Sequence, residues 1–306
     1  MRRVLTALAA AALAAATGVA TGLPAAAKAS APAAAGDSIK TSPYVALGDS
    51  YSSAAGLKPV INVLCQRSAR NYAHLIKART HATRFTDVTC GGAKTTDFFD
   101  AQYPGTAPQL DAVTKSTRLV TMTIGGNDGD VFTSMIASCA SVSSGDVTGN
   151  PCQKKEGATF SDTIAKKTYP GLVKALTAVR ARAPRATVVI LGYPRLLPDV
   201  GDPHCYASMP YSMGDVPYMM GVEEDLNMAV EKAAAQTGAR YVDMFPSSKG
   251  HDACAPASRR WIEPLVGAVG ANPVHPNAVG EAAMATQTLA QLRHCPPRRP
   301  AHGPGI

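Results

Sequence analysis

Four short stretches of the sequence combine residue types that could do chemistry, and each one follows a predicted strand or opens a predicted helix. They are Gly48-Asp49-Ser50-Tyr51-Ser52, Cys90-Gly91-Gly92-Ala93, Ile124-Gly125-Gly126-Asn127-Asp128 and Asn272-Pro273-Val274-His275-Pro276-Asn277. Each stretch offers a different chemical group: a hydroxyl, glycine backbone, a neutral amide and an imidazole. The four are more specific together than any one of them is alone.

Ser50 is the candidate nucleophile. It stands at a turn from a strand into a helix, so it should lie at the carboxyl edge of a parallel sheet, where such sheets bind ligands. Its backbone N–H would then point from a helix N-terminus, where a negative charge is favoured. The stretch is not a G-x-S-x-G elbow, because position 52 is serine. Taken alone, Ser50 could equally be a helix N-cap.

The two glycine-containing turns are candidate sites for binding an oxyanion. Gly91 and Gly92 would let the backbone approach a ligand closely, although alone they predict an ordinary turn. Asn127 offers a neutral N–H donor, which suits an oxyanion that develops only in the transition state. The alternative for Asn127 is a simple role as a turn former.

His275 is the candidate general base, because it lies between two prolines at the start of the last predicted helix. The remaining histidines stand mid-helix, in polar loops or in the tail, namely His74, His81, His204, His251, His294 and His302.

These stretches must be positioned by strands and helices that alternate along the chain. Short apolar runs predict strands at 44–47, 119–124, 187–191 and 239–244, with a weaker one at 85–88. Helical spacing of apolar residues predicts helices at 69–79, 163–182, 222–236 and 277–292. Continuous apolar strands of this kind favour a parallel sheet that is covered on both faces. The sequence therefore predicts a three-layer α/β/α domain with about five parallel strands.

Composition excludes several classes of protein. The 306 residues are 46% hydrophobic and 17% charged, which fits neither a disordered chain nor a coiled coil. The net charge is +8, but several cations lie near the two ends, and no cluster of Lys and Arg predicts a nucleic-acid interface. We therefore expect no nucleic-acid partner.

The chain begins like an exported protein. Two arginines precede an apolar run from Val4 to Ala20, and small residues follow. We expect a signal peptide over 1–29, a disordered leader over 30–40, a catalytic domain over 41–295 and a disordered Pro-rich tail over 296–306. The first run is weakly apolar and no later stretch is long enough to span a bilayer, so we expect secretion without stable membrane insertion.

Seven cysteines should be oxidised where geometry allows in an exported protein. Their number permits many pairings, and loop-closure entropy favours neighbours: Cys65–Cys90, Cys139–Cys152 and Cys205–Cys254, with Cys295 left over. Zinc-type spacing is absent from the sequence, so we expect no metal.

The four stretches, in this order, resemble the SGNH (GDSL-type) hydrolase family, and the resemblance extends from Val45 to Gly280. It implies a flavodoxin-like fold, Ser50 as nucleophile and His275 as base. It also implies an oxyanion hole made by the Ser50 N–H, Gly92 and Asn127, and it requires no cofactor. The chain is most similar to secreted actinomycete lipases and esterases, whose three successive disulfides match the pairing above.

The sequence departs from the family pattern at Asn272, where an Asp usually stands three residues before the histidine. Some secreted relatives orient the imidazole with a backbone carbonyl, so we expect a Ser–His dyad with the Asn272 carbonyl in that role. The side-chain Oδ1 of Asn272 is the alternative acceptor. Asp243 and Asp252 remain as distant alternative acids.

The substrate is less well defined. Residues 193–221 are rich in Tyr and Met, so they could form a wall of an acyl-binding cleft or could merely pack on the core. The first alternative predicts fatty-acyl esters, lipids or phospholipids as substrates. We expect the enzyme to be a monomer. A carbohydrate acetyl esterase and a secreted binding protein without activity remain as alternative functions.

Overall fold

Five short strands form a parallel sheet in the computed structural model, which describes residues 41–293. The strands are β1 (Tyr44–Ala46), β4 (Phe85–Asp87), β5 (Leu119–Met122), β6 (Thr187–Leu191) and β7 (Arg240–Val242), in the order β4-β1-β5-β6-β7. β1 and β5 are buried along their whole length, which explains their continuous apolar sequences. The flavodoxin-like order and the five predicted strands are confirmed.

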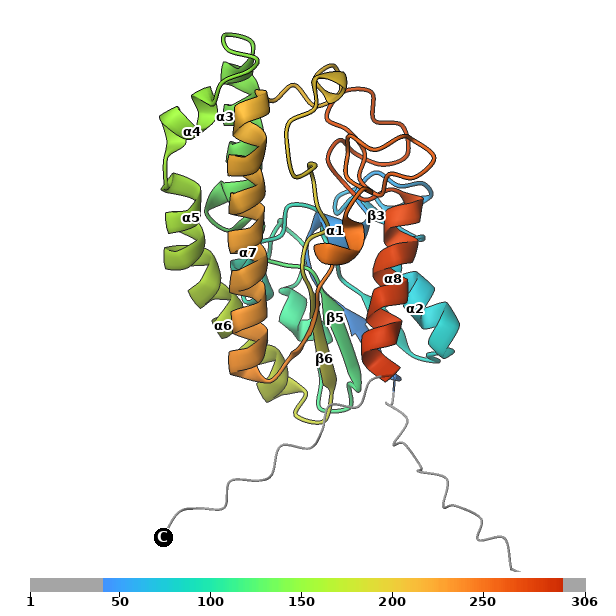
Figure 1. The fold of residues 1–306 in the computed structure, drawn as a ribbon. Helices are drawn as coiled ribbons and strands as arrows, with labels where there is room; N and C mark the ends of the chain where they lie inside the picture. The colour runs from blue at the N-terminus through green and yellow to red at the C-terminus, as the bar shows by residue number, and fades with distance from the viewer. Residues whose placement is uncertain (1–40, 294–306) are drawn as a thin grey trace, which may run out of the picture. The chain divides into compact units, whose positions relative to one another are not determined.

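Helices cover both faces of this sheet (Figure 1). On one side α2 (Tyr72–Thr80) packs against α8 (Ala278–Arg293), and on the other α6 (Tyr169–Arg182) packs against α7 (Val216–Thr237). These are the four predicted helices, with α7 starting earlier than expected. The first turn of predicted helix 163–182 is instead a π-helical segment, Ile164–Thr168. Gly238 ends α7 in the left-handed conformation that glycine favours.

The short helix α1 (Ser50–Ser53) follows β1, as expected for the serine turn. Several other elements were not predicted from the sequence. They are α3 (Val131–Ser143), α4 (Pro151–Glu156), α5 (Thr159–Thr163) and an antiparallel hairpin of β2 (Val60–Asn62) and β3 (Arg67–Ser68). Single 3₁₀ turns occur at Thr95–Phe98, Gln109–Ala112, Asp128–Asp130, Pro203–Cys205, Met213–Asp215 and Pro246–Ser248. α3 escaped prediction because its many Ser, Thr and Ala residues blur the apolar stripe.

Three disulfides join Cys65 to Cys90, Cys139 to Cys152 and Cys205 to Cys254, as the sequence predicted. Cys295 and the segments predicted to be a signal peptide, a leader and a Pro-rich tail lie outside the described residues. Within residues 41–293, no helix is both long and apolar enough to cross a membrane.

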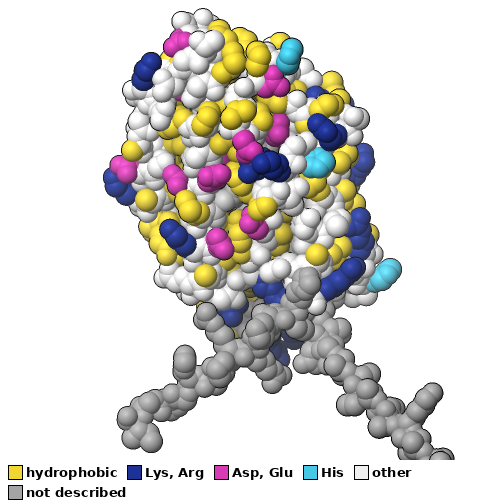
Figure 2. All heavy atoms as spheres, in the orientation of Figure 1, with side chains coloured by type: hydrophobic (Ala, Val, Ile, Leu, Met, Phe, Trp, Pro, Cys, Tyr) yellow, Lys and Arg dark blue, Asp and Glu magenta, His cyan; other side chains and the backbone are white. Residues whose placement is uncertain are grey.

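Charged side chains are unevenly distributed on the face shown in Figure 2. Acidic side chains gather toward the middle of this face, among hydrophobic ones. Along the right-hand edge, the side on which α2 and α8 lie in Figure 1, basic and histidine side chains are visible and acidic ones are not.

Candidate active site

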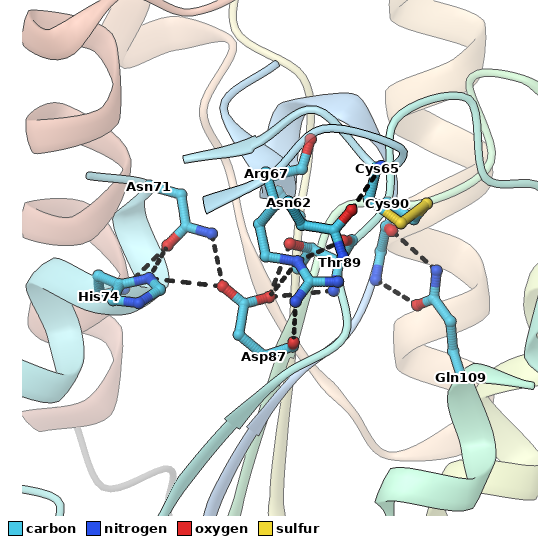
Figure 3. Close-up of polar contacts among 12 residues, drawn as sticks. Asn62, Cys65, Arg67, Asn71, His74, Asp87, Thr89, Cys90 and Gln109 are labelled. Carbon is cyan, nitrogen blue, oxygen red and sulfur yellow. Dashed lines mark hydrogen bonds and ion pairs between the residues drawn. A yellow bond between two sulfur atoms is a disulfide. The ribbon is translucent and has the colours of Figure 1, made fainter. Parts of the chain in front are cut away.

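The turn after β1 places Ser50 at the carboxyl edge of the sheet. Gly48 has a φ of +122°, and a side chain there would lie 2.3 Å from the Thr123 carbonyl oxygen, so only glycine fits. The side-chain amide of Gln109 donates to the Gly48 carbonyl (3.0 Å) and accepts from the Gly48 N–H (2.7 Å). Figure 3 labels Gln109 and marks two contacts of its side-chain amide as dashed lines. Ser50 then opens α1, as predicted for a strand-to-helix turn.

A cavity of about 280 Å³ brings Ser50, Asn127 and His275 together. Its other polar lining comes from Asp49 and Gly126. The remaining walls are largely apolar or aromatic and consist of Tyr51, Phe132, Thr133, Ile136, Ala137, Tyr193 and Val274. Three of the four predicted site residues therefore share one cavity, although they are far apart in the sequence.

The imidazole of His275 is oriented by the backbone, as predicted, but by a different residue. Its Nδ1 lies 2.8 Å from the carbonyl oxygen of Pro273. The Asn272 carbonyl instead accepts the backbone N–H of His275 (3.2 Å), and the Asn272 side chain donates to Gln66 (2.5 Å). The assignment of the Asn272 carbonyl was therefore wrong. The physical reason is the backbone of Val274, whose left-handed φ of +59° turns the carbonyl of Pro273 toward the imidazole ring.

This contact fixes the protonation pattern of His275. A carbonyl oxygen can only accept, so Nδ1 must carry the proton and Nε2 keeps a free lone pair. Burial lowers the pKa of His275 below its ordinary 6.5, although the Pro273 carbonyl acts in the opposite direction. The ring is thus neutral at neutral pH, which is the state a general base needs. Asp243 and Asp252 accept hydrogen bonds from Phe245 and Cys254 and make no contact with His275.

Tyr51 connects the serine turn to the histidine loop. Its hydroxyl donates to the Val274 carbonyl (2.8 Å), and its ring centroid lies 5.4 Å from that of His275. No hydrogen bond joins Ser50 to His275 directly in the part of the chain that the structure describes. The two side chains nevertheless line the same cavity.

The predicted oxyanion donors lie on the turns beside Ser50. Gly92 has a φ of +77° and an exposed backbone whose N–H donates to no acceptor within residues 41–293. Its neighbours are held: the Gly91 N–H donates to the Cys65 carbonyl (2.9 Å) and the Ala93 N–H to the Cys90 carbonyl (3.1 Å). Gly92 is not among the residues that line the cavity, in contrast to Asn127.

Asn127 is tied to the Gly92 turn. Its side-chain amide donates to the Ala93 carbonyl (3.0 Å) and retains a second N–H for another acceptor. The Ser50 N–H is likewise without an acceptor among the described residues. The Ser50 N–H and the second Asn127 amide N–H are therefore both available to an acceptor in the cavity that these two residues line.

A hydrogen-bonded chain behind Ser50 was missed from the sequence. Gly126 N–H donates to the Tyr193 hydroxyl (2.9 Å), which donates to Asp49 Oδ2 (2.5 Å). The other carboxylate oxygen accepts from the Tyr51 N–H (3.0 Å) and the Thr123 hydroxyl (2.6 Å). Burial raises the pKa of Asp49 to about 6, while these donors act to lower it. The signal for Tyr193 was its place just after β6, at the same sheet edge.

The apolar wall of the cavity comes from α3 and not from the Met-rich segment. Phe132, Thr133, Ile136 and Ala137 present one face of α3 to the cavity, at helical spacing. Of residues 193–221, only Tyr193 lines it. Met209, Tyr211, Met219 and Met220 are buried in the core. The second alternative for this segment, packing on the core, is the one observed.

The fold and this cavity are those of an ester hydrolase built on a flavodoxin-like sheet. The chain belongs to the GDSL-like Lipase/Acylhydrolase family, whose sequence model matches residues 46–283. It is 50% identical to Lipase 2 of Streptomyces coelicolor over 296 residues, covering 95% of this chain and 97% of that protein. It is thus a carboxylic ester hydrolase, as predicted.

Two solved structures are also similar. The extracellular lipase of Streptomyces rimosus has a TM-score of 0.69 at 30% identity, and phospholipase A1 of Streptomyces albidoflavus has a TM-score of 0.66 at 29% identity. Each comparison covers 81% of this chain and 98% of the other.

Proposed function

We propose that this protein is a secreted hydrolase of fatty-acyl esters that uses a Ser50–His275 dyad. The observation that carries the proposal is the 2.8 Å contact between His275 Nδ1 and the Pro273 carbonyl, in a cavity that also contains Ser50. It leaves Nε2 of a neutral imidazole as the only free base position on that ring.

In the first step, Ser50 Oγ attacks the ester carbonyl carbon while His275 Nε2 takes the hydroxyl proton. The tetrahedral oxyanion accepts hydrogen bonds from the backbone N–H groups of Ser50 and Gly92 and from the Asn127 amide. His275 then protonates the leaving alcohol, and an acyl-serine remains. Water hydrolyses the acyl-serine by the reverse sequence, with His275 again as the base.

The cavity lining supports an apolar acyl group as the preferred substrate. Phe132 and Ile136 offer hydrocarbon surface beside Ser50, whereas a sugar would need convergent polar groups. Tyr51 and Tyr193, whose rings pack edge to face with centroids 5.1 Å apart, add aromatic surface to the cavity. We therefore favour fatty-acyl and phospholipid esters over the acetyl groups of carbohydrates.

Export is supported by three disulfides in the described chain and by a relative that is an extracellular lipase. We propose that residues 1–29 are removed during secretion and that the mature protein acts outside the cell.

Turnover of a p-nitrophenyl ester by purified protein tests the proposal. Ser50→Ala and His275→Ala should each lower kcat by about 10⁶, because nucleophile and base act as one unit. Ser53→Ala is the matched control, since Ser53 lies on the same helix but its hydroxyl donates to the Ser50 carbonyl (3.2 Å). Retention of activity by Ser50→Ala would contradict the proposal.

A further inference from the structure

The β2–β3 hairpin exposes an unusual run of apolar side chains. Val60, Ile61, Val63 and Leu64 are 36%, 55%, 85% and 52% exposed, respectively. Scattered apolar residues on a surface need no explanation, but contiguous ones on one element indicate a binding surface. The two central ones, Val63 and Leu64, lie in the turn itself, between β2 and β3.

The hairpin is held so that this turn cannot fold back onto the core. The turn is closed by the Gln66 N–H, which donates to the Val63 carbonyl (3.2 Å). Cys65 is bonded to Cys90, and Arg67 Nε donates to the Thr89 carbonyl (2.8 Å), so the hairpin is fixed to the chain just after β4 (Figure 3).

The same turn lies beside the candidate active site. On one side it contacts the Gly91–Gly92 turn, because the Gly91 N–H donates to the Cys65 carbonyl (2.9 Å). On the other side Gln66 accepts from Asn272, three residues before His275. The loop that leads to Asn272 carries two more exposed valines, Val266 and Val269, at 53% and 86%. Apolar side chains thus project from both segments that border the site.

Positive charge flanks the hairpin. The chain from Ser50 to Thr86 carries six Lys or Arg and no Asp or Glu. Lys58 precedes β2 and Arg70 follows β3, and both are exposed. Neither makes an ion pair with any residue that the structure describes. Five of these cations are spread along the hairpin and α2 and the sixth, Arg84, lies just before β4, which is why the sequence showed no compact basic cluster.

We propose that the β2–β3 hairpin docks the enzyme onto an anionic phospholipid surface, with Val63 and Leu64 entering the apolar layer and Lys58 and Arg70 contacting lipid phosphates. Apolar side chains with cations beside them suit this boundary. A projecting turn offers far less surface area than the ~800 Å² that each partner buries in a stable protein interface, so a lipid surface fits this hairpin better than a protein partner does. The inference rests on the proposed function, because docking here would present lipid esters to Ser50.

Binding to phospholipid vesicles tests the inference without catalysis. The parent is Ser50→Ala, so that the lipids are not consumed, and the probes are phosphatidylglycerol and phosphatidylcholine vesicles in a sedimentation assay. Adding Val63→Ser and Leu64→Ser should lower the partition coefficient on phosphatidylglycerol by about tenfold or more. Adding Lys58→Gln and Arg70→Gln should lower it by roughly tenfold on phosphatidylglycerol alone. High salt should mimic the second change.

Two matched controls remove similar groups elsewhere. Met228→Ser removes an exposed apolar side chain from α7. Arg84→Gln removes an exposed cation just before β4, at the amino end of that strand, whereas the hairpin is fixed to the chain after its carboxyl end. Both should bind vesicles as the parent does. With Ser50 restored, every variant should hydrolyse a soluble short-chain ester at the wild-type rate, which shows that it is folded.

Unchanged vesicle binding by the Val63→Ser, Leu64→Ser variant would overturn the inference. So would light scattering that shows the parent to be a dimer which this variant dissociates, because the hairpin would then bind a second copy of the chain. The proposed function can fail independently of this inference. If the function is wrong, the protein with Ser50 will not hydrolyse the soluble ester, but vesicle binding by the Ser50→Ala parent can still be measured.

Discussion

The imidazole of His275 is oriented by the backbone carbonyl of Pro273, and the conformation of the intervening residue, Val274, explains why. Val274 adopts a φ of +59°, a conformation that β-branched residues rarely take. The Val274 carbonyl is fixed in turn by the Tyr51 hydroxyl at 2.8 Å. The local strain is therefore supported by a buried hydrogen bond, and the result is an acceptor for Nδ1 that carries no full charge.

The first prediction concerns Asn272→Ala. Its carbonyl and the Pro273 carbonyl both survive this change, so kcat/KM for a soluble ester should stay within about tenfold of the parent. What is lost is the 2.5 Å contact with Gln66, which lies away from the imidazole. Steady-state kinetics measure this directly. A loss near 10⁴, the size seen when a triad acid is disabled, would mean that the Asn272 side chain orients His275 after all.

The second prediction concerns Tyr193→Phe. The variant leaves Asp49 Oδ2 and the Gly126 N–H without their shared partner, so the free energy of unfolding should fall by about 1–2 kcal/mol. Because Tyr193 links the Ser50 turn to the Asn127 turn, kcat should fall by roughly tenfold with little change in KM.

Tyr211→Phe is the matched control for this change. Tyr211 is also buried, but its hydroxyl has no hydrogen-bond partner among the described residues, so its removal should cost no stability or activity. Urea unfolding and ester kinetics on both variants decide the matter. Equal effects at the two positions would show that Tyr193 acts only by packing.

At the scale of elements, α3 is the part of the molecule that should determine which acyl group is accepted. It presents Phe132 and Ile136 to the cavity, and the Cys139–Cys152 disulfide fixes its second half to α4. Met209, Tyr211, Met219 and Met220, which belong to the segment that first suggested the acyl site, are instead buried in the core.

The third prediction follows from this wall. Ile136→Trp should fill the cavity beside Ser50 and lower the ratio of kcat/KM for a p-nitrophenyl decanoate to that for the butyrate by about tenfold. Ser134→Trp is the control, because Ser134 is exposed on α3 and does not line the cavity. An unchanged ratio for Ile136→Trp would place the acyl group elsewhere.

The fourth prediction separates two disulfides. Removing either Cys65–Cys90 or Cys205–Cys254 by paired substitution to Ala should lower the free energy of unfolding by ~2–4 kcal/mol. Only the first loss should also lower kcat, because Cys90 adjoins the turn that carries Gly92. Melting curves and kinetics below the melting temperature provide the test. Equal effects on kcat would remove the special role of the first disulfide.

For the whole molecule, the parallel sheet was predictable because its strands are continuous apolar runs that end at glycine. Leu119–Met122 and Thr187–Leu191 are the clearest cases. Ser50, Asn127 and His275 were predictable because parallel strands end at one edge, so their carboxyl-end turns converge.

The remaining features depend on three-dimensional packing. The Pro273 carbonyl could not be chosen over that of Asn272 without the φ of Val274, which no local sequence rule assigns. Tyr193 and α3 were missed for a related reason. Their importance comes from which elements lie beside Ser50, and hydrophobic periodicity does not report on that arrangement.

The measurement that tests the central claim most directly is covalent trapping with a fluorophosphonate, followed by peptide mass spectrometry. The account predicts a single adduct on the Ser50 side chain, formed at least about 10²-fold more slowly in His275→Ala because the general base is absent. Ser52 and Ser53 lie in the same helix and serve as internal references. An adduct on any other serine, or labelling of Ser50 that is unaffected by His275→Ala, would contradict the account.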